Sequence, residues 1–146
     1  MKIIEITLYE FDELSESAKK VALNEFCDIN INDNWWYNIY EDAKNIQLKI
    51  TSFNERYWPE IEFLQSPIDT ANEIIVQHRK DCKTYEYATY FLIGVNNKSD
   101  FHRNLKAEFC TMLSKEYDYL VSDDAIIESI ECNEYLFTDE GKFYPL

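Results

Sequence analysis

The chain has 146 residues, 46% of them hydrophobic and 16% aromatic, which is enough to build one folded domain with a sizeable core. Acidic residues number 28 against 14 basic ones, and the resulting formal charge of −14 disfavours direct binding to nucleic acid or anionic lipid. No apolar run reaches the roughly 18 residues of a membrane span, and the acid-containing first ten residues do not resemble a signal peptide.

The first third of the chain predicts one strand followed by two helices. Residues 3–9 are β-branched and aromatic with partial alternation, which favours a strand. Residues 11–43 have the spacing of two amphipathic helices joined by an Asx-rich turn at 28–32. Ser15 is expected to cap the first helix and Asp33 the second.

The second helix would carry Trp35 and Trp36, and its apolar spacing places Trp36 in the core. Alternating residues at 48–53 and 60–64 then predict two strands that pair with each other. The loop between these strands would hold Arg56, Tyr57 and Trp58.

Further helices are expected in the second half. Ser66 followed by Pro67 and then by Asp69 is typical of a helix start. Residues 84–95 fit a helix through their apolar spacing or a strand through alternating tyrosines, and we favour the helix.

A long helix should open at Ser99 or Asp100, and another should follow the break at Ser122. Residues 135–144 then predict a closing hairpin. The fold class is therefore α+β, a single domain over 1–146 with several helices packed on a small, mainly antiparallel sheet.

Sequence motifs that identify common enzyme classes are missing. Two glycines are too few for a phosphate-binding loop, and neither a G-x-S-x-G elbow nor a calcium-binding loop is present. His78 lies on the apolar stripe of its helix, where a packed side chain is the simpler interpretation, and His102 is expected at the surface. We therefore predict no catalytic residue, no metal site and no cofactor.

Four cysteines are scattered without CxxC spacing and are predicted to be buried, reduced thiols in a reducing cytoplasm. They are Cys27, Cys82, Cys110 and Cys132. A Cys–His dyad stays open as an alternative, because catalytic neighbours need not be close in sequence.

Acidic residues are concentrated at the two ends of the chain. Residues 117–146 have a net charge of −7 and residues 1–17 a net charge of −4, so the ends would form one acidic surface if they meet. Simple solubility is the competing explanation. The predicted protein-binding residues are Asp118, Asp123, Asp124, Glu128, Glu131, Glu134, Asp139 and Glu140.

Two stretches, YEFDELSESAKKVA from Tyr9 and EYDYLVSDDAIIESIECNEYLFTDEG from Glu116, carry a resemblance. They resemble the ends of a group of small, acidic, largely uncharacterised proteins of phages and prophages of low-GC bacteria. The resemblance leaves out the middle of the chain and brings no catalytic residues. It implies a phage protein that acts in the bacterial host cytoplasm by binding a host defence protein.

The resulting hypothesis is a non-enzymatic inhibitor, an anti-CRISPR or similar protein, whose acidic face imitates nucleic acid. Its partner would be the basic surface of a CRISPR effector or a restriction enzyme, with no direct contact to nucleic acid or membrane. The alternatives are an antitoxin-like protein-binding module and a Cys- or metal-dependent hydrolase of unfamiliar type. The sequence does not predict the oligomeric state.

Overall fold

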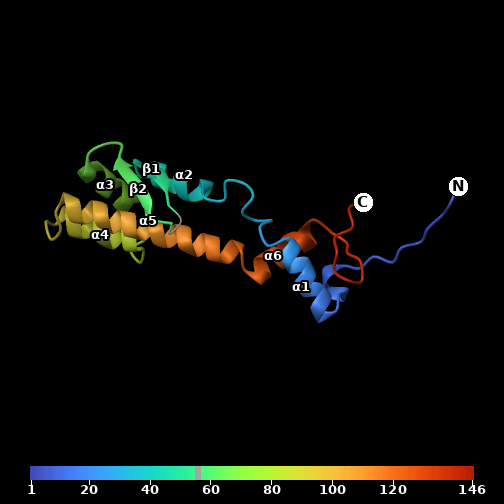
Figure 1. The fold of residues 1–146 in the computed structure, drawn as a ribbon. Helices are drawn as coiled ribbons and strands as arrows, with labels where there is room; N and C mark the ends of the chain where they lie inside the picture. Colours follow the sequence, from blue (N-terminus) through green and yellow to red (C-terminus); the bar gives the residue numbers. More distant parts are fainter. Residues whose placement is uncertain (55–56) are drawn as a thin grey trace. The chain divides into compact units, whose positions relative to one another are not determined.

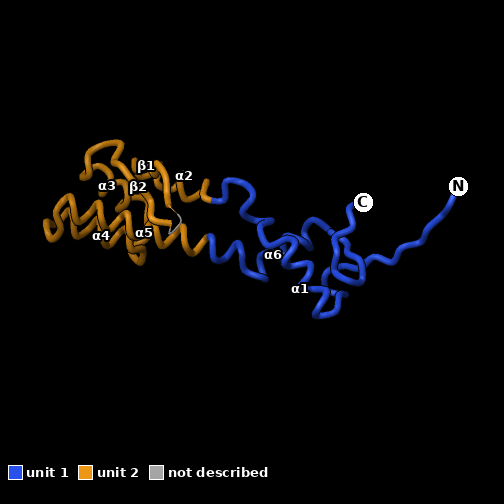
Figure 2. The backbone as a smooth tube through the Cα atoms, viewed as in Figure 1, with its two compact units in different colours: residues 1–35, 117–146 blue, residues 36–116 orange. Residues whose placement is uncertain are grey.

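A computed structural model describes residues 1–54 and 57–146 (Figure 1). Its helices and short antiparallel sheet confirm the predicted α+β class. The backbone divides into two compact units, of which unit 1 comprises residues 1–35 and 117–146 and unit 2 comprises residues 36–116 (Figure 2). That the whole of 1–146 is one domain stays a prediction.

The sheet of unit 2 consists of β1 (Leu48–Phe53) and β2 (Pro59–Phe63), which pair antiparallel. Ile50 lies opposite Ile61 and both are buried, whereas the neighbouring Lys49 is exposed, as the two-residue period of a strand requires. The two predicted strands are therefore confirmed. Of the predicted loop residues, Arg56 lies outside the described part of the chain.

Four helices complete unit 2: α2 (Tyr37–Asn45), α3 (Pro67–Gln77), α4 (Lys83–Leu92) and the first part of α5 (Lys98–Leu120). α3 begins as predicted, since the Ser66 hydroxyl accepts the Asp69 N–H at 3.2 Å. α4 confirms the helix expected near residues 84–95. The core contains Ala43, Ile46, Leu48, Ile50, Ile61, Ala71, Ile74, Ala88, Phe101, Leu105 and Phe109.

The predicted position of Trp36 in the core is wrong, and so is the predicted cap at Asp33. α2 begins only at Tyr37, and Trp36 is half-buried beside Phe53, with the ring centroids 5.5 Å apart. Before this helix the backbone makes a tight turn, in which the Trp35 N–H donates to the backbone carbonyl of Asp33 at 2.7 Å. This turn keeps the two indoles out of the regular helix.

Unit 1 contains α1 (Glu16–Glu25), α6 (Asp123–Cys132) and the short 3₁₀ helix η1 (Phe11–Glu13). The helix starts at Ser15 and Ser122 are confirmed, because each hydroxyl accepts the N–H three residues on, at 3.2 and 3.3 Å. The core is made of Phe11, Leu14, Ala18, Ala22, Ile126, Ile130 and Phe137.

The predicted strand over residues 3–9 is wrong. Only Tyr9 pairs, through a single bridge to Phe137, whereas Ile3 and Ile4 are 82% and 78% exposed. β-Branched composition favours a strand only where a neighbouring strand is available, and the C-terminal segment offers a partner to Tyr9 alone. The closing hairpin itself is confirmed by the bridge between Phe137 and Phe143.

Within the described residues, no helix combines the length and the apolar character needed to cross a membrane.

Candidate functional site

Unit 1 carries most of the negative charge of the protein. It contains sixteen acidic and four basic residues, a net charge of −12, whereas unit 2 contains twelve and ten, a net charge of −2. All sixteen acidic side chains of unit 1 are exposed. Exposed carboxylates at this density attract a positively charged surface.

The eight predicted binding residues all belong to unit 1, and we refer to them as the acidic surface. They lie at the end of α5, along α6, just after α6 and in the turn of the hairpin. On α6, Asp124, Glu128 and Glu131 follow one another at four- and three-residue spacing, which places them on one exposed stripe. The acidic surface comprises Asp118, Asp123, Asp124, Glu128, Glu131, Glu134, Asp139 and Glu140.

Residues near the two ends of the chain meet in unit 1. The Tyr9 N–H donates to the Phe137 carbonyl at 2.8 Å, and the Phe137 N–H donates back at 2.9 Å. The Phe11 ring packs edge-on against Phe137 with centroids 6.4 Å apart. These contacts bring the acids that flank Phe11 to the carboxyl end of α6, where both groups line a common pocket.

This pocket, which we call the acidic pocket, has a volume of about 630 Å³. Part of its lining is apolar: Phe11, Ile130, Tyr135, Leu136 and Leu146. The rest is acidic: Glu10, Asp12, Glu131 and Glu134. In the described part of the chain, none of these four carboxylates pairs with a basic side chain, and the ion pairs of unit 1 are instead Glu16–Lys19 and Glu140–Lys142.

Two of these carboxylates stand where a helix disfavours them. Glu131 lies in the last turn of α6, at the negative end of the helix dipole, and that turn has no basic residue. Glu134 follows the helix with φ of 55°, a left-handed conformation that favours Gly or Asn. The sequence predicted Glu131 and Glu134 as binding residues, but it did not predict that they line one pocket with Glu10 and Asp12.

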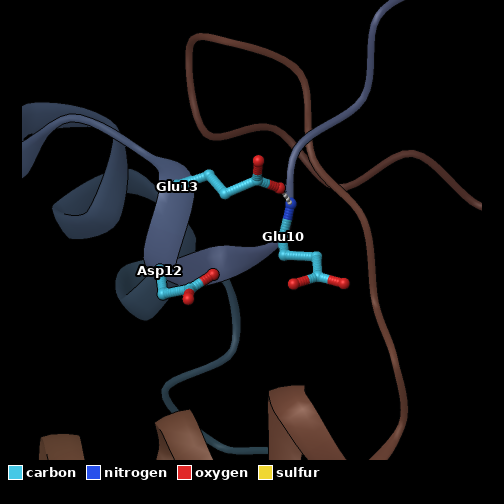
Figure 3. A group of neighbouring side chains, drawn as sticks. All are labelled: Glu10, Asp12 and Glu13. Carbon is cyan, nitrogen blue, oxygen red and sulfur yellow. Dashed lines mark hydrogen bonds between the residues drawn. The ribbon is translucent and has the colours of Figure 1, made fainter.

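Figure 3 shows three neighbouring acidic side chains around η1. One carboxylate oxygen of each lies within 4.8 Å of those of the other two. They are Glu10, Asp12 and Glu13, all exposed. Oxygen ligands of this kind suit Mg²⁺ or Ca²⁺. However, Glu13 Oε1 accepts the Glu10 N–H at 2.8 Å, so a capping role explains part of the cluster, and we do not assign it to a metal.

A second pocket, of about 610 Å³, lies in unit 2 and contains both a histidine and a cysteine. His78 Nδ1 is 2.5 Å from the Thr84 hydroxyl, and burial lowers the pKa of His78, partly opposed by the Asp42 carboxylate. Cys82 is half-buried at the N-cap of α4. One of the Cys–His pairs that the sequence left open therefore lines a common pocket.

Glu108 also lines this second pocket, and burial raises its pKa, partly opposed by Lys115 and Lys83. The other histidine, His102, is half-buried rather than at the surface, and its Nε2 lies 3.0 Å from the Ile61 carbonyl oxygen. It lines neither of the two pockets described here.

The prediction of four buried cysteines is wrong. Cys27 and Cys132 are exposed, and Cys82 and Cys110 are half-buried. Cys27 follows the end of α1 and Cys132 is the last residue of α6, so neither lies in the middle of a helix.

Comparisons with protein families, with curated proteins and with solved structures gave no match to this chain.

Proposed function

We propose that the protein is a non-enzymatic inhibitor that binds a basic surface of another protein through the acidic surface of unit 1. The observation that carries this proposal is the separation of charge, −12 on unit 1 against −2 on unit 2. A charge spread only for solubility would have no reason to gather on one unit. Gathered charge instead speeds the encounter with an oppositely charged partner and orients it.

The partner we propose is a protein that binds nucleic acid, because carboxylates on a helix can imitate phosphates. Asp124, Glu128 and Glu131 provide one charge per roughly 5 Å of helix at 1.5 Å per residue. A DNA strand provides one per roughly 3.4 Å, so the two densities are comparable. The resemblance to phage proteins makes a CRISPR effector the first candidate and a restriction enzyme the second, with a basic toxin as the alternative.

The test measures inhibition of DNA cleavage by such enzymes, together with the salt dependence of binding. Neutralising Asp123, Asp124, Glu128 and Glu131 to Asn or Gln should abolish inhibition and flatten the dependence of affinity on salt. The matched control neutralises four exposed acids of unit 2, Glu60, Glu62, Asp69 and Asp81, and should leave both unchanged. Equal slopes for the two quadruple variants would remove the acidic surface from the interface.

A second candidate function, hydrolysis at the pocket of unit 2, is favoured by the presence of His78 and Cys82 in that pocket. A histidine beside a cysteine can act as the general base for a thiol nucleophile. Turnover of activated ester substrates that disappears in Cys82→Ser but persists in Cys110→Ser would support it. Without such turnover, the binding proposal stands alone.

A further inference from the structure

We infer that acid opens the connection between α3 and α4, because a hydrogen bond between His78 and Thr84 closes this connection only while the imidazole ring is neutral. We call this pair of side chains the clasp. The inference goes beyond the proposed function, since the clasp belongs to unit 2. Opening would expose Cys82, which is half-buried and lies within the connection.

The clasp joins the two ends of a short connection. His78 is the C-cap of α3 and Thr84 is the second residue of α4, and the ring Nδ1 lies 2.5 Å from the hydroxyl oxygen. Among the described backbone hydrogen bonds, one has both ends within 79–83, from the Cys82 N–H to the Arg79 carbonyl at 3.0 Å. Residues 79–81 are exposed. A segment with so few bonds opens locally at low cost, so the clasp is its main restraint.

Burial fixes which atom of the clasp donates. Thr84 is 1% exposed, and within the described residues its hydroxyl has no hydrogen-bond partner other than His78. A hydroxyl carries one proton, and a buried donor without an acceptor is costly. The Thr84 hydroxyl therefore donates to an unprotonated Nδ1, and the neutral ring carries its proton on Nε2.

Protonation of the ring removes the acceptor on which the clasp depends. Once Nδ1 carries a proton it can only donate, so the buried hydroxyl proton loses its acceptor. The ring itself is half-buried, and burial lowers the pKa of His78 although the Asp42 carboxylate opposes this effect. The other charged or titratable side chains that line the pocket with the ring are Arg79, Asp81, Cys82, Lys83 and Glu108.

These neighbours do not offset the charge of a protonated ring. Arg79 and Lys83 repel it, and Asp42 and Asp81 only balance these two bases in number. Burial raises the pKa of Glu108, so this carboxylate takes up a proton as the ring does and its negative charge is lost. The charged ring is therefore more stable in water than in the closed clasp.

The position of the ring proton is measured on the uniformly ¹⁵N-labelled full chain at pH 7.5. Long-range ¹H–¹⁵N correlation spectra distinguish a ring protonated on Nε2 from one protonated on Nδ1. We expect the Nε2 form for His78, and the Nδ1 form would overturn the inference. This measurement depends on no variant.

Opening is measured through the rate at which Cys82 reacts with 4,4′-dithiodipyridine, relative to its rate in a peptide of residues 78–86, which corrects for the effect of pH on the thiol. Mass spectrometry of the digested protein separates the cysteines. Between pH 7.5 and pH 5.0 the relative rate should rise by up to about thirtyfold, because pH 5.0 lies about 1.5 units below the ordinary histidine pKa of about 6.5. An unchanged relative rate would overturn the inference. An equal rise at Cys110, on α5, would also overturn it, because the whole unit would then have unfolded.

Two variants test the two sides of the clasp. His78→Asn places a carbonyl oxygen, which accepts a hydrogen bond at either pH, near the position of Nδ1 and should keep Cys82 protected at pH 5.0. Thr84→Val removes the hydroxyl and should expose Cys82 at both pH values. The matched control His102→Gln replaces the histidine that lines neither pocket and should keep the wild-type rise. A rise that persists in His78→Asn would attribute the acid effect to the carboxyl groups of the pocket and overturn the clasp.

Discussion

At the scale of single residues, Glu108 shows how burial sets a dependence on pH. Burial raises its pKa, so the folded state holds the proton more tightly than the unfolded state does. Its contribution to stability is therefore complete below its unfolded pKa of about 4.3 and is lost as pH rises through the folded pKa. At pH 7 the ionised carboxylate opposes folding.

Glu108→Gln should consequently raise the thermal unfolding midpoint at pH 7 and have little effect at pH 4. Thermal melts followed by circular dichroism at both pH values measure this difference. Glu116→Gln, on the same helix, is the control, because it removes the same charge from a residue that does not line the second pocket. A Glu108→Gln midpoint that stays at the wild-type value at pH 7 would contradict the burial argument.

His78 has the opposite sign, because burial lowers its pKa and so favours the neutral ring. Its contribution to stability is present above its unfolded pKa of about 6.5 and is lost as pH falls through the folded pKa. The hydrogen bond to Thr84 adds a buried partner for the ring. The two contributions therefore oppose each other, because Glu108 favours folding at pH below about 4.3 and His78 favours it at pH above about 6.5, so neither is complete between these values.

From the sequence, the burial of single residues near helix ends was predicted wrongly. Sequence analysis placed Trp36 and Cys27 in the core, because hydrophobic spacing fixes the buried side of a helix only when the ends of that helix are known. Trp36 precedes α2 and Cys27 follows α1, so neither obeys the spacing. Glu10 and Glu131 share a pocket through contacts between the two ends of the chain, which no local pattern encodes.

At the scale of elements, local chemistry was predictable and long-range pairing was not. The helix starts at Ser15, Ser66 and Ser122 depend on a hydroxyl that accepts an N–H three residues away, and all three were predicted. A strand at residues 3–9 would need a partner strand far along the chain, and this prediction was wrong because only Tyr9 forms a bridge. The prediction of strands β1 and β2 was correct, because the two strands pair with each other and are close in sequence.

Gly141 shows how closely the hairpin of unit 1 packs on α1. Its φ is +87°, and a Cβ at this position would lie 2.1 Å from the carbonyl oxygen of Ala18. Gly141→Ala must therefore add a backbone clash to the cost of about 1–2 kcal/mol for a left-handed alanine. We expect it to unfold unit 1 or to lower the urea midpoint strongly.

The matched control is Gly94→Ala, where φ is +83° but no atom lies within 4 Å of the added Cβ. It should show only the conformational cost. Urea unfolding of both variants, monitored by circular dichroism, separates the clash from the strain. Equal losses of stability in the two variants would show that the hairpin moves away from α1 without cost.

For the molecule as a whole, each unit has its own core, but most of the negative charge lies on unit 1. Sequence analysis predicted that the two ends of the chain are acidic and would form one surface if they meet, and the contact between Tyr9 and Phe137 brings them together. It did not predict that residues 36–116 would form a compact unit with nearly balanced charge. Chain length favours a single domain. The division into two units was not predictable from length, because it depends on which residues pack into a common core.

Unit 2 is continuous in sequence and has its own core, from Ala43 through the sheet to Phe109. A fragment comprising residues 36–116 should therefore fold by itself and unfold in one cooperative transition, measured by circular dichroism and by dispersed amide resonances. Because its net charge is −2, it should lack the salt-dependent binding that we propose for the full chain. A fragment without cooperative unfolding would support the single domain over 1–146. If it folds and binds a basic partner with the salt dependence of the full chain, the acidic surface of unit 1 is not the binding site.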